Sequence, residues 1–125
     1  MKTLNIPDGH NQVMPYLIVP NAAAFIEFAK AVFGAEERYK AMRTETLIQH
    51  AEITIGQSVI MLADATDQFK KQPAGIFVYV DDCDAVFKKA IDNGATTSMA
   101  PADQTYGRSG GFNDAFGNTW WVTSV

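Results

Sequence analysis

The stretch from His50 to Ala63 constrains the fold most, because it predicts a tight β-hairpin. Gly56 occupies the first position of a two-residue turn, where a type II′ turn favours glycine. This turn places Glu52 opposite Met61, and side chains alternate between the two faces of each strand. We expect one face to lie in the core and the other, which carries His50 and Glu52, to line a cavity. The predicted core face contains Ala51, Ile53, Ile55, Ile60 and Leu62.

Length and composition favour one globular domain. The chain has 125 residues, of which 47% are hydrophobic and 19% charged, values ordinary for a soluble protein. A net charge of −4 argues against nucleic acid as a partner, since phosphate binding needs clustered Lys and Arg. No apolar run approaches the ~20 residues that span a bilayer, and we expect no membrane partner. Cys83, the single cysteine, has no intramolecular disulfide partner, so we expect a cytoplasmic location.

The first half of the sequence predicts one strand, one helix and three further strands. A β-rich run covers residues 15–19, and a helix then begins after Asn21, a good N-cap residue. Gly34 is expected to end this helix. A charged strand follows over 36–43, before the two strands of the hairpin.

The same pattern restarts after a polar loop at 64–73. A strand is expected over 75–80, and a helix begins at the acidic run 81–84, where carboxylates favour a helix N-terminus. Residues 95–106 are expected to be irregular, and two strands follow over 110–113 and 119–123. We interpret the two halves as an internal repeat, each half being a strand, a helix and three strands.

This repeated βαβββ unit resembles the vicinal oxygen chelate superfamily. The superfamily includes glyoxalase I, extradiol dioxygenases, fosfomycin-resistance enzymes and bleomycin-binding resistance proteins. Seven segments, running nearly end to end, are similar to the PhnB-like branch of glyoxalase-like proteins. They are Asn5–His10, Met14–Val19, Phe33–Glu36, His50–Gly56, Ser58–Leu62, Tyr106–Gly110 and Asp114–Trp121. The resemblance implies an α+β fold of two modules, at about 14–65 and 75–125, whose sheets curl into a trough, and a homodimer.

The resemblance also indicates that the usual metal is missing. Metal enzymes of the superfamily place a His or Glu at four positions, which correspond here to Met14, Met61, Gly75 and Trp121. Glycine has no side chain, indole offers only an N–H donor, and a thioether suits soft ions such as Cu(I). We therefore expect neither a metal nor another cofactor at these positions.

The superfamily mapping places a set of aromatic and sulfur-containing side chains on the cavity wall. These predicted ligand-binding residues are Tyr16, Met61, Phe77, Tyr79 and Trp121. Their rings can stack on a ligand or can simply fill the trough. Arg108, expected in a loop at the mouth of the second trough, can bind an anionic group or remain solvated.

His50 and Glu52 are the candidate catalytic residues. They lie two apart on one strand face, so their side chains start roughly 6–7 Å apart. They can act as an acid–base pair, provided that the cavity raises the pKa of the carboxyl group. Alternatives are a solvated pair, or a relocated metal site that lacks an evident third ligand. His10 is expected to be exposed.

Three functions follow from these observations. The leading hypothesis is a dimer that binds a small organic molecule without the superfamily metal. The second is an enzyme, either an isomerase or lyase using Glu52 with His50 or a metal-dependent member with displaced ligands. The third is a structural dimer whose cavity is collapsed by Met61 and Trp121.

Overall fold

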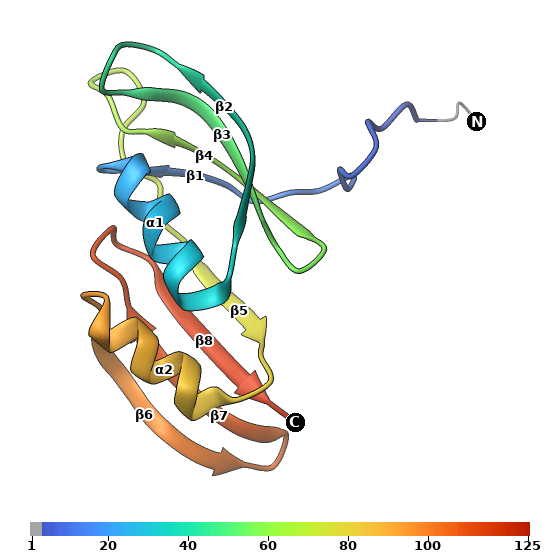
Figure 1. Cartoon of the computed structure of the whole chain (residues 1–125), viewed down its shortest axis with the longest axis vertical. Helices are drawn as coiled ribbons and strands as arrows, with labels where there is room; N and C mark the ends of the chain where they lie inside the picture. The colour runs from blue at the N-terminus through green and yellow to red at the C-terminus, as the bar shows by residue number, and fades with distance from the viewer. Residues whose placement is uncertain (1–3) are drawn as a thin grey trace.

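A computed structural model describes residues 4–125 of the chain. It contains two mixed four-stranded sheets, each with one helix, as shown in Figure 1. The α+β fold of two tandem βαβββ modules predicted from the repeat is confirmed.

The first module contains five elements, and its sheet has the order β1-β4-β3-β2. Strands β1 and β4 run parallel, while β3 pairs antiparallel with both β4 and β2. The elements are β1 (Tyr16–Val19), α1 (Ala22–Phe33), β2 (Glu36–Met42), β3 (Ile48–Ile55) and β4 (Ser58–Asp64).

The second module repeats this topology, with the sheet order β5-β8-β7-β6. Strands β5 and β8 run parallel, as β1 and β4 do in the first module. The elements are β5 (Gly75–Tyr79), α2 (Cys83–Asp92), β6 (Thr96–Gln104), β7 (Gly107–Asn113) and β8 (Thr119–Ser124).

The predicted hairpin is confirmed as β3 and β4. Glu52 pairs with Met61 and Ile53 with Ile60, which is the register that the two-residue turn requires. Gly56 has a φ of 59°, a conformation that glycine adopts without steric cost. The predicted core face is buried at Ala51, Ile53, Ile60 and Leu62.

Helix α1 also begins and ends as predicted. The Asn21 side chain accepts a hydrogen bond from the amide of Ala24 at 3.2 Å, and Gly34 follows the last turn with a φ of 67°. In the second module, Asp82 caps α2 by accepting from the amide of Ala85 at 3.1 Å. Side-chain caps thus define the start of both helices.

The expectation that residues 95–106 are irregular is wrong. Residues Thr96–Gln104 form β6, which pairs antiparallel with β7 and has two register shifts. Most of its side chains are exposed, and it contains Pro101. A strand with irregular pairing and few buried residues lacks the alternation by which strands are recognised.

The two modules share one apolar core, and α1 lies between them (Figure 1). The ring of Phe33 lies 4.8 Å from that of Trp120, between ring centroids, and Phe25 stacks on Trp120 at 6.3 Å. Phe28 meets Phe112 of β7. Because these contacts use the helix-bearing faces of both sheets, the opposite faces carry the exposed aromatic side chains.

Within residues 4–125, neither helix is long and apolar enough to cross a membrane.

Candidate functional site

The open face of the first sheet carries the His50–Glu52 pair expected from the hairpin. The two residues are neighbours on β3, and Nε2 of His50 lies 2.9 Å from Oε2 of Glu52. On the other side of the imidazole, Nδ1 lies 3.1 Å from the hydroxyl of Tyr16, which β1 supplies. Strand β4 separates β1 from β3, so the phenol reaches across one strand to meet the imidazole.

A second histidine joins this pair, contrary to the expectation that His10 is exposed. Nε2 of His10 lies 2.7 Å from Oε1 of Glu52, and the His10 side chain is partly buried. We call Tyr16, His50, Glu52 and His10 the His50 network. Sequence reasoning missed His10 because the contact joins residues 42 positions apart and belongs to no repeating pattern.

The segment before β1 holds His10 in place. The amide of His10 donates to the carbonyl of Pro7 at 3.1 Å, which closes a turn. The carbonyl of Gly9 accepts a hydrogen bond from Arg38 on β2 at 2.7 Å. Gly9 has a φ of 81°, and a Cβ there would lie 2.5 Å from the Arg38 guanidinium. The positive φ therefore favours glycine where the segment crosses Arg38.

The His50 network lowers the pKa of Glu52. Hydrogen bonds from His10 and then from His50 favour the carboxylate and outweigh the effect of burial, which acts in the opposite direction. The expectation that the cavity raises this pKa is therefore wrong. Glu52 is an ionised acceptor held by two imidazoles, not a protonated general acid.

The ionised carboxylate also determines which nitrogen of a neutral His50 carries the proton. A carboxylate only accepts hydrogen bonds, so the Nε2 atom that faces Glu52 carries the proton. In the neutral imidazole Nδ1 is then an acceptor, and the Tyr16 hydroxyl donates to it. The Tyr16 hydroxyl thus donates to the imidazole and the imidazole donates to the Glu52 carboxylate, an arrangement that suits proton transfer at the Tyr16 hydroxyl.

An open groove lies beside the network on the same sheet face. It has a volume of about 650 Å³. Tyr16 and His50 contribute to its wall, whereas Glu52 does not line it and is only 8% exposed. Glu52 is thus placed to orient His50 rather than to touch a ligand. We call this the first-sheet groove; its lining includes Tyr16, Ile18, Tyr39, Arg43, His50 and Phe69.

The other predicted ligand-binding residues lie elsewhere in the chain. Met61 lines a groove of about 540 Å³ under the N-terminal segment, together with His10. Phe77 and Tyr79 line a groove of about 530 Å³ between the β3–β4 turn and β5. Trp121 pairs with Phe77 on the open face of the second sheet. Within one chain, these side chains do not form a single cavity with Tyr16.

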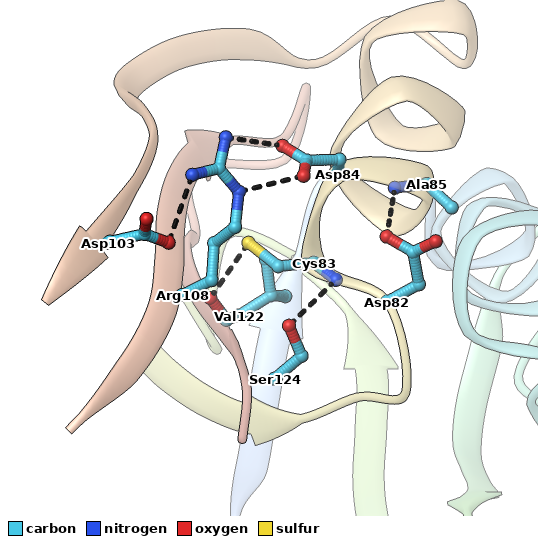
Figure 2. A network of polar contacts seen from close by, with 8 residues as sticks. All are labelled: Asp82, Cys83, Asp84, Ala85, Asp103, Arg108, Val122 and Ser124. Carbon is cyan, nitrogen blue, oxygen red and sulfur yellow. Dashed lines mark hydrogen bonds and ion pairs between the residues drawn. The ribbon is translucent and has the colours of Figure 1, made fainter.

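Arg108 lies in β7 rather than in the expected loop, and it contacts α2 (Figure 2). Its Nε donates to Oδ2 of Asp84 at 2.7 Å and its Nη2 to Oδ1 at 3.2 Å. Asp103 accepts a third hydrogen bond from Nη1 at 3.1 Å. These bonds raise the pKa of Arg108. Gly111 of the same strand faces Trp121 on the open face of the sheet. Arg108 lies three positions earlier, so its side chain points to the opposite, helix-bearing side.

Cys83 lies at the first turn of α2 and is buried. Its thiol donates a weak hydrogen bond to the carbonyl of Val122 at 3.5 Å (Figure 2). Burial, reinforced by the charge of Asp84, raises the pKa of this thiol. A protonated buried thiol packs as a small apolar group and is a poor nucleophile.

The donors present do not fit the superfamily metal. Among residues 4–125, no group of three or more His, Cys, Asp or Glu side chains is arranged to hold an ion. His10 and His50 contact opposite oxygens of Glu52. The four superfamily positions hold Met14, Met61, Gly75 and Trp121, which offer no hard donor.

The lowered pKa of Glu52 makes part of the stability depend on pH. A depressed folded-state pKa stabilises the fold above the unfolded value, near 4.5, and this contribution disappears as pH falls through the folded value. Wild-type protein should therefore lose more unfolding free energy between about pH 7 and about pH 3.5 than Glu52→Gln. Urea unfolding at each pH measures both losses. The exposed Glu45→Gln variant is the control, and equal losses in all three proteins would contradict the assignment.

Comparisons with known proteins agree with this architecture. The model of the Glyoxalase/Bleomycin resistance protein/Dioxygenase superfamily matches residues 9–122. The Mycobacterium bovis protein Mb0911c is 32% identical over 118 residues, which cover 85% of this chain and 78% of that protein.

Solved structures share the same fold. TioX from Micromonospora sp. ML1 is 20% identical with a TM-score of 0.73, and the match covers 92% of this chain and 96% of TioX. The PhnB protein from Bacillus cereus is 18% identical with a TM-score of 0.71, over 92% of this chain and 100% of that protein. The resemblance predicted from sequence is thereby confirmed: the chain belongs to the Glyoxalase/Bleomycin resistance protein/Dioxygenase superfamily.

Proposed function

We propose that this protein binds a small organic molecule in the first-sheet groove, without the superfamily metal. The observation that carries the proposal is the grouping of aromatic rings around His50 in a groove of about 650 Å³. Small-molecule sites are typically concave, of roughly 300–1,000 Å³, with mostly apolar walls and a few placed polar groups. The ring of Tyr16 stacks with His50 at 5.4 Å between centroids, and Tyr39 lies 5.9 Å from the same imidazole.

This groove also weighs against a purely structural role. The structural hypothesis requires Met61 and Trp121 to fill the cavity, and neither side chain lines the first-sheet groove. A hydrogen-bonded imidazole at the wall supplies a polar contact whose position is fixed by Tyr16 and Glu52.

Filling the groove should abolish binding. Ala41 lines it from β2, and an Ala41→Trp change places an indole in its volume. Wild-type protein should give saturation-transfer NMR signals with members of a mixture of small aromatic compounds, whereas the variant should give none. Ala23→Trp, at an exposed position on α1, is the matched control and should bind as wild type does. Equal signals from wild type and Ala41→Trp would refute the proposal, and so would no binding to wild type.

A second candidate function is proton transfer by an isomerase or lyase, and the His50 network favours it. A hydroxyl bonded to an imidazole that is oriented by a carboxylate is the arrangement that activates hydroxyl groups in many enzymes. Tyr16 and His50 line the groove, while Glu52 lies behind them. In this function Tyr16 and His50 exchange a proton with the substrate and Glu52 positions His50.

The proton-transfer function can be tested without a known substrate. Small α-hydroxy and α-keto carbonyl compounds are incubated with protein in D₂O, and loss of their C–H signals is followed by NMR. Tyr16→Phe should slow any catalysed exchange by about 10²-fold or more, since it removes the hydroxyl and keeps the ring. Tyr39→Phe is the control, because its ring flanks the same imidazole. Absence of exchange with wild type, or full activity in Tyr16→Phe, would exclude this role.

We also propose that the working form is a homodimer. The open face of the second sheet exposes a cluster of apolar rings, with Phe77 50%, Tyr79 71% and Trp121 36% exposed. Contiguous exposed apolar side chains mark interaction surfaces, and a second copy can supply the cover that one chain lacks.

A charge within this aromatic cluster should prevent dimer formation. Analytical ultracentrifugation of wild-type protein should give twice the mass of one chain, whereas Tyr79→Asp should shift the equilibrium towards one chain. Tyr106→Asp, at an exposed tyrosine in the β6–β7 turn, should remain dimeric. A monomeric wild type would contradict the proposal, as would a dimer unaffected by Tyr79→Asp.

A further inference from the structure

The arginines of this chain differ in how their guanidinium groups are used. Arg38 donates to the carbonyl of Gly9, and Arg108 donates to Asp84 and Asp103. Arg43 forms neither a hydrogen bond nor an ion pair through its guanidinium with any side chain in the described range 4–125. Its guanidinium carbon lies over the ring of Phe69, 6.0 Å from the ring centroid.

The backbone of Arg43 is held at the wall of the first-sheet groove. Arg43 immediately follows β2, and its amide donates to the carbonyl of Leu47 at 2.8 Å. Phe69 is held on the opposite loop, where its amide donates to the Thr66 hydroxyl at 2.9 Å. Both Arg43 and Phe69 line the groove. The guanidinium therefore sits beside an aromatic wall on a constrained backbone.

Two carboxylates at or behind the groove, Asp64 and Glu52, are committed to other partners. Asp64 lines the groove but is buried, and its two oxygens accept from the amides of Ala22 at 2.7 Å and Ile48 at 2.6 Å. Glu52 is held by His10 and His50. Neither carboxylate is free to pair with Arg43, and its guanidinium forms no ion pair among residues 4–125.

We propose that the first-sheet groove takes a planar aromatic anion, with its ring against Tyr16, Tyr39 and Phe69 and its charged group on Arg43. A guanidinium binds a carboxylate through two parallel hydrogen bonds, which gives orientation as well as affinity. This inference rests on the proposed function, because it specifies the ligand class of the same groove.

Two nearly isosteric probes separate the charge from the ring. 2-Naphthoate and 2-naphthamide share the same ring system, but only the first is anionic at neutral pH. Titrations followed by ¹H–¹⁵N NMR give both dissociation constants and show whether shifts gather at groove residues such as Ala41 and Gln49. Wild-type protein should bind the acid about tenfold more tightly than the amide, a preference of about 1.4 kcal/mol.

Arg43→Gln should remove this preference while leaving the affinity for 2-naphthamide close to that of wild type. Lys40→Gln is the matched control, because it removes one positive charge from β2 at an exposed side chain outside the groove lining. The control should keep the tenfold preference.

The possible outcomes distinguish this inference from the proposed function. If both probes bind in the groove with equal affinity, or if Arg43→Gln keeps the preference for the acid, the ligand class is wrong and the groove remains a binding site. If neither probe shifts groove residues in wild type, the inference is refuted together with binding of aromatic compounds there. Loss of the preference for the acid in Arg43→Gln, while Lys40→Gln keeps it, supports the inference.

Discussion

The packing of α1 against Trp120 is the interaction on which the rest of the structure depends. Phe25 and Phe33 of the first module contact this indole of the second. Its Nε1 donates to Asp114 at 2.8 Å, and the same carboxylate accepts from the amides of Phe116 and Asn118. A buried N–H with a fixed acceptor holds the indole in one orientation. Helix α1 can therefore pack against both sheets at once.

This shared core determines which surfaces remain for function. The helices lie against one face of each sheet (Figure 1), and the exposed rings of Tyr16 and Trp121 lie on the opposite faces. Tyr16 and His50 occupy one of these faces and Trp121 the other. The arrangement separates, within one chain, residues that the superfamily resemblance assigns to one trough. A second copy is one way to bring such surfaces together.

Features set by neighbouring residues could be predicted from the sequence, whereas those set by distant contacts could not. The Gly56 turn fixed the register of β3 and β4, and Asn21 marked the start of α1, because both act within a few residues. The same local logic failed for β6, where bulges interrupt the alternation. It also failed for Arg108, because its ion pair with Asp84 joins residues 24 positions apart. The positions of His10 beside Glu52 and of Arg43 at the groove wall became apparent only from the folded arrangement.

The contact of His10 with Glu52 has a consequence for what counts as one working unit. The repeat that defines the fold begins at β1, yet a donor to the carboxylate of the His50 network comes from a residue before that repeat. A chain trimmed to its two modules would keep every helix and strand and still leave one oxygen of Glu52 without its imidazole. The boundary of the structural repeat and the boundary of the His50 network are thus different.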